Sequence, residues 1–302
     1  MILITGASGF IGRHVVETLA GNGGRVRALV RSARGAAVLD GVDCELARGD
    51  VTDPASLAAA TVGVDTVVHL VAIIAGKRAD FERVIVEGTA NVIGAARAAG
   101  VRRLVYMSAL GTSAQTKDAV PYYQAKWACE QAVQTSGFSH AILRPSFVFG
   151  RDGGALPRFL RIARLAPVTP VVAPGTQRLQ PIWVDDLARA VELAAGREDD
   201  LLVELGGPDV VDWNELWRAI KDTLGTRRPS LRIPAALIRP AALVLEQLPD
   251  PPVTRDQLTM LRLGDNVVSD EGAGMAALGL GELVPLDEQL RRAVTTTPSP
   301  PA

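Results

Sequence analysis

A tyrosine and a lysine in the middle of the sequence are spaced so that both can act on one ligand. Tyr122 and Lys126 stand four residues apart, and on a helix such positions share one face. A phenol has an ordinary pKa of about 10 and exchanges protons poorly at neutral pH unless a nearby cation lowers that pKa. Tyr123 has no such partner, because Trp127 follows it at the same spacing. The pair predicts a proton donor or acceptor in Tyr122, tuned by the Lys126 ammonium.

A glycine-rich segment, TGASGFIG, occupies residues Thr5 to Gly12. Its G-x-x-G-x-x-G spacing joins an apolar strand-like run to a predicted helix over Ile11 to Ala20. Glycines allow a sharp turn and close approach to a diphosphate, which the N–H groups of the helix N-terminus then bind. A tight turn also favours glycine for conformational reasons alone, which is the structural alternative. The residues predicted to bind a dinucleotide here are Gly6, Ser8, Gly9, Phe10, Ile11 and Gly12.

Two arginines lie about 20 residues beyond this loop, where the choice between nicotinamide cofactors is made. Arg31 and Arg34 stand where an acidic side chain would accept the ribose hydroxyls of NAD. A guanidinium suits the 2′-phosphate of NADP, so the sequence favours NADP(H) over NAD(H), and Arg13 could add to this charge. The alternative is a solvated basic loop. Further on, Asp50 and Val51 are predicted to contact the adenine edge, although Asp50 could equally cap a turn.

Short apolar strands alternate with helical segments through the first half of the chain. Continuous apolar strands are typical of a parallel sheet buried on both faces. Asp53 and Pro54 supply an N-cap and an N1 proline for one of the helices. The alternation predicts an α/β fold, a doubly wound parallel (Rossmann) sheet. The strands are expected at residues 2–5, 25–30, 44–47, 66–71, 104–107, 140–143 and 201–205, and the helices at 11–20, 54–60, 81–99, 122–135 and 184–195.

The regular alternation of strands and helices is lost in the second half of the chain, because prolines interrupt it after residue 150. We expect residues 1–150 to form a dinucleotide-binding core, completed by elements from about 181–206. Residues 151–294 would then form mainly a small mixed lobe for a substrate or partner, and residues 295–302 a disordered tail. The apolar segment 234–248 either covers this lobe or lies against a membrane or a partner.

Composition narrows the possible functions further. The 302 residues carry a net charge of −1, which gives no indication of nucleic-acid binding. The two cysteines indicate neither a disulfide framework nor a metal site. No secretion signal or membrane-spanning run is visible, so we expect a cytoplasmic protein, with peripheral attachment at the inner face of a membrane as the alternative.

Several further motifs follow the glycine loop along the chain, and the full series is TGASGFIG, VDTVVHLVA, GTANV, LVYMS, YYQAK, LRPSFVFG and PIWVDDLA. With these motifs in this order, the chain resembles the extended short-chain dehydrogenase/reductase superfamily, also called the NAD-dependent epimerase/dehydratase superfamily. The resemblance implies dinucleotide contacts at the end of the fourth strand, a role for Lys126 on the nicotinamide ribose, and a segment from Pro145 to Gly150 that runs under the nicotinamide. A buried strand end is the alternative for that segment. The residues so implied are Leu70, Val71, Ala72, Lys126, Pro145 and Val148.

Two helpers of the family's tyrosine are missing. The resemblance implies a Ser or Thr that polarises the substrate carbonyl, but Ala109 stands at that position. Ile85 occupies the position of the asparagine that holds a water. Ser108, Thr112 and Ser113 are the candidates to substitute for the missing hydroxyl. The predicted catalytic residues are Tyr122, Lys126 and Ser108.

With these departures, and with the segments YYQAKWACEQAV and LTMLRLGDNVV, the chain is most similar to the nucleotide-binding accessory subunit of respiratory complex I and its bacterial relatives. That branch implies tightly held NADP(H) and a connection with quinone or lipid metabolism. One hypothesis is therefore an NADP(H)-dependent oxidoreductase acting on an apolar, quinone- or isoprenoid-related carbonyl or alcohol. The second is a non-catalytic NADP(H)-binding or redox-sensing module of a respiratory or quinone-biosynthesis complex. A nucleotide-sugar epimerase or dehydratase is a further alternative.

Overall fold

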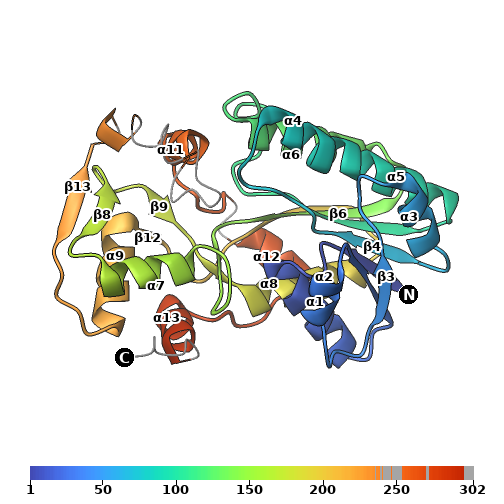
Figure 1. The fold of residues 1–302 in the computed structure, drawn as a ribbon, viewed down its shortest axis with the longest axis horizontal. Helices are drawn as coiled ribbons and strands as arrows, with labels where there is room; N and C mark the ends of the chain where they lie inside the picture. Colours follow the sequence, from blue (N-terminus) through green and yellow to red (C-terminus); the bar gives the residue numbers. More distant parts are fainter. Residues whose placement is uncertain (235, 239, 241–245, 247–253, 270–271, 296–302) are drawn as a thin grey trace. The chain divides into compact units, whose positions relative to one another are not determined.

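The computed structural model describes residues 1–234, 236–238, 240, 246, 254–269 and 272–295, which fall into two compact units (Figure 1). Most of the apolar segment 234–248 and most of the C-terminal tail lie outside the described residues. The first unit comprises Met1–Pro145, Val184–Leu205 and Asp270–Gly281. The second comprises Ser146–Trp183, Gly206–Ser269 and Glu282–Ala302.

The first unit is built on a seven-stranded sheet in which every neighbouring pair is parallel. The chain runs outward from β1 through β2 to β3, then crosses back to β4, so the strand order reverses between β1 and β4. This confirms the predicted doubly wound sheet. In order across the sheet the strands are β11 (Leu201–Leu205), β6 (Ser139–Pro145), β5 (Arg103–Met107), β4 (Thr66–His69), β1 (Ile2–Thr5), β2 (Val26–Val30) and β3 (Glu45–Arg48).

Helices cover both faces of this sheet (Figure 1). On one face α1 (Phe10–Gly21) packs on α8 (Val184–Ala195), which also contacts α12 (Ala273–Leu278). The other face carries α3 (Pro54–Ala60), α5 (Gly88–Ala98) and α6 (Pro121–Gln134), and the short α2 (Ala33–Ala37) follows β2. The carboxylate of Asp53 accepts a hydrogen bond from Ala55 N, which confirms the predicted cap of α3.

The helix predicted over residues 81–99 differs in the structure. The segment forms a short α4 (Arg78–Phe81), a π-helical stretch η1 (Glu82–Glu87) and then α5. The apolar spacing that predicts a helix does not distinguish π from α hydrogen bonding. The π-helical stretch could therefore not be predicted from the spacing of the apolar residues. Within η1 the Ile85 carbonyl accepts a hydrogen bond from the Cys129 thiol of α6 at 3.4 Å. The π-helical stretch is thereby tied to the helix that carries Tyr122 and Lys126.

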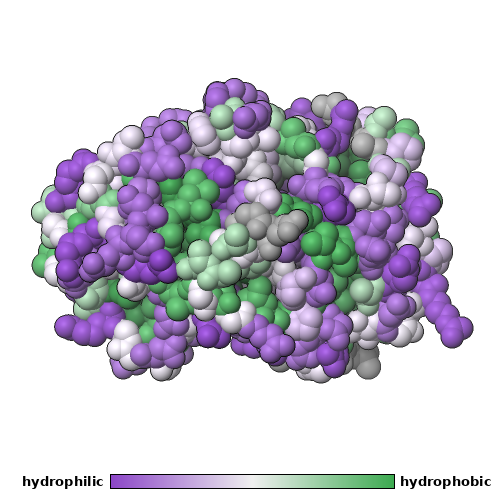
Figure 2. All heavy atoms as spheres, turned by 180° about the vertical axis from the view of Figure 1, so that it is seen from behind, coloured by the Kyte–Doolittle hydropathy of each residue, from purple (hydrophilic) through white to green (hydrophobic). Residues whose placement is uncertain are grey.

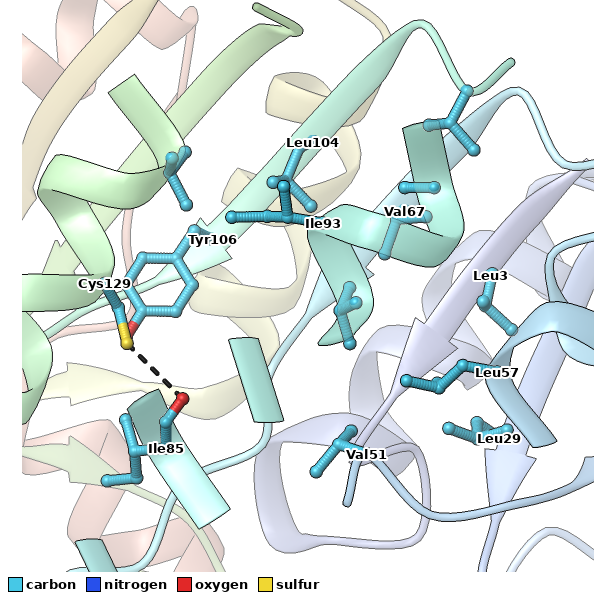
Figure 3. Close-up of a cluster of buried hydrophobic side chains, with 14 of the residues drawn as sticks. Leu3, Leu29, Val51, Leu57, Val67, Ile85, Ile93, Leu104, Tyr106 and Cys129 are labelled. Carbon is cyan, nitrogen blue, oxygen red and sulfur yellow. Dashed lines mark hydrogen bonds between the residues drawn. The ribbon is translucent and has the colours of Figure 1, made fainter. Parts of the chain in front are cut away.

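A large apolar core lies between the sheet and the helices α3, α5 and α6 (Figure 3). Leu3, Val67 and Leu104 enter it from three adjacent strands, and Ile93 enters it from α5. Burying each such side chain stabilises the fold by about 1.5–3 kcal/mol. The strand ends at one edge of the sheet are therefore held on a rigid base.

The second unit combines two-stranded sheets with short helices. Its aromatic core joins α7 to α9 through Phe159, whose ring centroid lies 5.6 Å from that of Trp213 and 5.3 Å from that of Trp217. The described elements are β7 (Val148–Phe149), α7 (Leu156–Leu165), β8 (Thr169–Val172), β9 (Arg178–Leu179), β10 (Ile182–Trp183), β12 (Val211–Asp212), α9 (Trp213–Thr223), β13 (Ser230–Ile233), α11 (Arg255–Arg262) and α13 (Leu286–Thr295).

Hydrophilic residues occupy much of the visible surface in Figure 2, and hydrophobic residues form several separate patches between them. Within the part of the chain that the structure describes, no helix is both long and apolar enough to span a bilayer.

Candidate functional site

The glycine loop joins β1 to α1 and presents an uncapped helix N-terminus. Gly6 adopts a left-handed conformation with φ of +74°, and the N–H of Gly9 donates to its carbonyl at 2.9 Å. Gly9 is the N-cap residue of α1 and offers no side chain to bond the first-turn amides. Such amides, together with the positive end of the helix dipole, favour an anion.

The loop is packed so closely that Gly12 leaves no room for a side chain, and a side chain on Gly6 would be strained by its left-handed backbone and a tight contact. A Cβ on Gly12 would lie 2.0 Å from the Gly6 carbonyl oxygen, and one on Gly6 would lie 3.1 Å from the Val71 nitrogen. The structure thus brings Leu70 and Val71, at the end of β4, against the loop, while Ala72 is exposed. The conformational and the ligand-binding explanations of these glycines are compatible.

His69, the last residue of β4, lies buried beneath the loop. Its Nδ1 is 2.6 Å from Thr5 Oγ1, and its Nε2 is 3.0 Å from Thr89 Oγ1 on α5. Burial, together with the charge of Lys126, lowers the pKa of the imidazole to about 3, so the ring is neutral at physiological pH. A neutral histidine bound by two hydroxyls joins β1, β4 and α5 where their ends meet.

The predicted selectivity residues lie where β2 ends. Arg31 follows β2 directly and is 77% exposed, and its Nη1 lies 3.8 Å from Asp50 Oδ2. Arg34 is exposed within α2. A Cβ on Gly35 would lie 3.1 Å from Ser8 Oγ, so the start of α2 approaches the glycine loop. The structure therefore brings both arginines to the side of the loop.

Asp50 caps a turn after β3. Its carboxylate accepts hydrogen bonds from the Thr52 amide and hydroxyl, each at 2.9 Å. Partial burial opposes ionisation, but these bonds and the charges of Arg31 and Arg83 lower the pKa of Asp50. Val51 is buried, and its carbonyl accepts a hydrogen bond from Asn91 Nδ2 of α5 at 3.0 Å.

Tyr122 and Lys126 lie on α6, as the spacing predicts, but the electrostatics differ from the expectation. Burial, with the nearby Tyr123, raises the pKa of Tyr122 above its usual range, because removing water disfavours the phenolate. Lys126 is itself buried, which lowers its pKa to about 8. Its Nζ donates to the Met107 carbonyl at 2.6 Å and lies 5.9 Å from the Tyr122 ring centroid. The expectation that Lys126 lowers the Tyr122 pKa is therefore wrong for this arrangement.

Ser108 belongs to a buried polar network that sequence reasoning missed. Its hydroxyl donates to Glu130 Oε1 at 2.5 Å, and Arg144 donates to both oxygens of the same carboxylate at 2.9 and 2.6 Å. The fully buried charge of Glu130 thus has a bidentate partner. One signal was available: Glu130 stands four residues after Lys126, on the helical face that also carries Tyr122.

The other candidate hydroxyl positions follow β5. Ala109 is half-buried and carries no hydroxyl, and Ile85 is fully buried in the apolar core. Thr112 is 1% exposed, and its hydroxyl has no hydrogen-bond partner among the described residues. The Tyr123 hydroxyl donates to the Leu110 carbonyl at 3.4 Å, a long contact beside Thr112. Ser113 instead bonds with the neighbouring Thr116 hydroxyl.

The parallel register gathers most of the predicted residues at the carboxyl edge of one sheet. Thr5 pairs with Leu29 and with His69, so the segments that follow β1, β2 and β4 emerge side by side. Pro145 ends β6, and its carbonyl accepts a hydrogen bond from the Leu110 amide at 2.9 Å. Val148 belongs to the second unit, where β7 pairs with β10.

Comparison with known proteins gives a family and several relatives. A model of the NAD dependent epimerase/dehydratase family matches residues 2–204. Ceramide reductase of Caulobacter vibrioides is 32% identical over 238 residues, which is 78% of this chain and 74% of the reductase. A 2-alkyl-3-oxoalkanoate reductase of Stenotrophomonas maltophilia is 31% identical over 215 residues, 64% of each chain. The mitochondrial NADH dehydrogenase (ubiquinone) 1 alpha subcomplex subunit 9 of Arabidopsis thaliana is 27% identical over 299 residues, 92% of this chain and 73% of the subunit.

Solved structures share the fold over nearly the whole chain. The crystal structure of gox2253 superposes with a TM-score of 0.78 and 26% identity, covering 98% of this chain and 97% of the other. The UDP-glucose 4-epimerase of Thermus thermophilus in complex with NAD gives a TM-score of 0.73 at 22% identity, covering 97% of each chain.

Replacing Gly12 by alanine should disrupt the loop, because the new methyl group would collide with the Gly6 carbonyl oxygen. We expect Gly12→Ala to lower the free energy of unfolding by about 3 kcal/mol. Gly21→Ala at the other end of α1 is the control, since a Cβ there meets nothing within 4 Å, and it should be neutral or slightly stabilising. Urea unfolding followed by circular dichroism measures both. Equal midpoints for Gly12→Ala and wild type would contradict the packing described.

The pH dependence of stability should report the environment of His69. The unfolded imidazole takes up a proton below its ordinary pKa of 6.5, whereas the folded one does so only near 3. The stability linked to this residue is therefore complete above pH 6.5 and is lost as the pH falls toward 3, by about 1.4 kcal/mol per pH unit. Urea titrations at pH 6.5 and pH 5 should show a smaller loss in His69→Gln than in wild type. A loss in His69→Gln as large as the loss in wild type would refute the assignment.

Proposed function

Because the chain belongs to the NAD dependent epimerase/dehydratase family, we propose that it is an NADP(H)-dependent oxidoreductase acting on the carbonyl or alcohol of an apolar substrate. The observation that carries this proposal is the position of Tyr122 and Lys126. Lys126 Nζ ties their helix to the carboxyl end of β5. Strand β5 belongs to the same parallel sheet as β1, and the glycine loop follows the carboxyl end of β1. A proton donor and a dinucleotide-binding loop at one edge are the two parts that carbonyl reduction requires.

The loop fits the diphosphate of a dinucleotide. Gly12 and Gly6 allow close packing, and the first-turn amides of α1 lack a side-chain cap that would compete for them. In this proposal the amides of the loop bind the diphosphate, Asp50 and Val51 lie at the adenine, and Lys126 binds the nicotinamide ribose. When bound, the nicotinamide supplies or accepts the hydride.

Tyr122 acts as the acid in the reduction. Its raised pKa keeps the phenol protonated at neutral pH, so it has a proton to give to the substrate oxygen as negative charge develops there. Lys126, whose pKa lies near 8, is mainly an ammonium at pH 7 and favours that charge electrostatically. Ser108 supports the site through Glu130, to which its only O–H is directed. The reverse reaction, alcohol oxidation, would need an ionised Tyr122 and is favoured by high pH.

Arg31 and Arg34 support a preference for NADP(H). No acidic residue stands between the end of β2 and the end of α2, at residues 31–37, to bind the ribose hydroxyls of NAD, and the exposed Arg31 guanidinium lies 3.8 Å from Asp50. An exposed pair at this distance is weak and contributes less than about 1 kcal/mol. Arg31 can therefore exchange Asp50 for a 2′-phosphate at little cost.

An apolar substrate is supported by the relatives and by the second unit. The ceramide reductase and the 2-alkyl-3-oxoalkanoate reductase are named for substrates that carry alkyl chains. In the second unit Phe147 and Trp213 are half-buried, with ring centroids 5.7 Å apart. Aromatic side chains that retain exposed surface can pack against an apolar ligand.

A second candidate function is a module that binds NADP(H) without turning it over. Ala109 lacks a hydroxyl, Ile85 lacks an amide, and the Ser108 proton is directed to Glu130, so the hydrogen bonds that usually assist such a tyrosine are missing. Losing one such donor typically slows a reaction by about 10²–10³. The relative in the NADH dehydrogenase complex favours this candidate, with attachment to a respiratory complex or a membrane surface.

Tyr122→Phe distinguishes the two candidates. We expect it to lower kcat for reduction of long-chain ketones by at least about 10²-fold, the usual contribution of a positioned acid. Tyr123→Phe is the matched control, because among the described residues its hydroxyl makes only the long contact with Leu110, and it should stay within about tenfold of wild type. NADPH consumption is followed by absorbance, and cofactor binding by fluorescence. Tight binding of NADPH without turnover in the wild type would favour the module instead.

Arg31→Ala tests the cofactor preference. Removing one charge-assisted contact should weaken NADPH binding about tenfold or more and leave NADH binding nearly unchanged. Arg25→Ala, at the opposite end of β2, removes the same charge away from the loop and should change neither affinity. Calorimetric titration measures both cofactors. Equal losses for NADPH and NADH in Arg31→Ala would refute a contact with the 2′-phosphate.

A further inference from the structure

The second unit contains a polar cavity that the proposed oxidoreductase chemistry does not use. Its volume is about 390 Å³, within the range of small-molecule sites. Three of its five lining residues are cationic. The lining consists of Asn214, Arg218, Lys221, Ser230 and Arg232.

Two elements supply this lining by their own periodicity. Asn214, Arg218 and Lys221 follow one another on α9 at spacings of four and three, which puts them on one helical face. The apolar residues Leu216 and Ile220 occupy the buried face of the same helix. On β13, Ser230 and Arg232 alternate with the 50% exposed Leu231, so both point to the same side of the strand.

Among the described residues, no carboxylate lies within ion-pair distance of the three cations of the cavity, Arg218, Lys221 and Arg232. Lys221 Nζ donates to Ser230 Oγ at 2.9 Å and to the Arg228 carbonyl at 3.3 Å, and Arg232 Nε reaches Asn214 Oδ1 at 3.4 Å.

Two acidic residues of α9 lie near these cations in the sequence, and neither is part of the lining. Glu215 is outside the lining and accepts a hydrogen bond from the Asp212 amide in the capping box of the helix. Asp222 is exposed and is also outside the lining. Three like charges around one hollow repel each other and create a positive potential that a bound anion would relieve.

We propose that this cavity is an anion-binding site for a phosphate group, carried by a small phosphorylated molecule or by a lipid headgroup. Two guanidinium groups and an ammonium offer donors on several sides, and a phosphate can accept from all of them, whereas a carboxylate has only two oxygens. The Ser230 hydroxyl adds a neutral polar group, whereas Asn214 forms part of the wall, since its Nδ2 donates to the Gly175 carbonyl at 2.7 Å and to the Pro174 carbonyl at 3.3 Å. The site lies wholly within the second unit, so it stands independently of the oxidoreductase assignment.

Calorimetric titration with inorganic pyrophosphate tests the proposal on the full chain. Wild type should bind saturably, and Arg218→Gln combined with Arg232→Gln should bind at least about tenfold more weakly, since each contact is charge-assisted. Lys221→Gln alone should give a smaller loss. Arg161→Gln combined with Arg189→Gln removes the same charge from exposed positions on α7 and α8 and should bind like wild type.

A second arm identifies the source of the phosphate. Sedimentation with phosphatidylglycerol vesicles, compared with phosphatidylcholine vesicles, should show binding that the cavity variant loses if the ligand is a headgroup. Pyrophosphate binding without vesicle binding assigns the site to a free phosphorylated molecule. The proposal is overturned if wild type binds neither probe, or if the cavity variant binds pyrophosphate as wild type does, because the anion would then sit elsewhere, for example at the glycine loop. Unchanged circular dichroism of each variant confirms that the fold is retained.

Discussion

The contact between Gly12 and the Gly6 carbonyl is the constraint on which the first unit depends. With no room for even one methyl group between them, the first turn of α1 lies directly against the end of β1. This contact sets where the helix begins, and so where its free amides point. Gly6 also packs against Val71 at the end of β4, where a Cβ on Gly6 would lie 3.1 Å from the Val71 nitrogen, so the loop is held from two sides at the point where the strand order reverses. In doubly wound sheets that point is where ligands bind.

Beneath this edge the structure buries polar groups that fix the site. Three of these groups have hydrogen-bond partners on other elements. His69 joins β1, β4 and α5, Lys126 binds the end of β5, and Glu130 receives Ser108 and Arg144. A buried ion pair contributes little net stability, but losing one partner leaves an uncompensated charge. Their value therefore lies in orientation, since they hold α6 and the strand ends in one arrangement.

Most of the fold could be predicted from the residues, because local pattern and tertiary structure agree there. The strands at Ile2–Thr5 and Leu201–Leu205 and the cap at Asp53 were accessible to periodicity and capping rules. The Tyr122–Lys126 face was predicted by spacing, but its electrostatics were not, because burial is a property of the whole packed unit. The same holds for Glu130 and Arg144, which are 14 residues apart and meet only when α6 packs on the sheet. The π-helical stretch at Glu82–Glu87 has no signature in apolar spacing.

The first unit is assembled from three separate stretches of chain, and this affects its synthesis. Strand β11 is parallel to β6 and closes the sheet beside it, yet residues 146–183 of the second unit are made between the two. During translation β6 therefore remains an open edge, with Ala141, Ile142 and Leu143 at its centre, until at least residue 205 has left the ribosome. An unpaired apolar strand of this kind is a template for association with other chains. A nascent chain that stalls within the second unit would thus be left prone to aggregation.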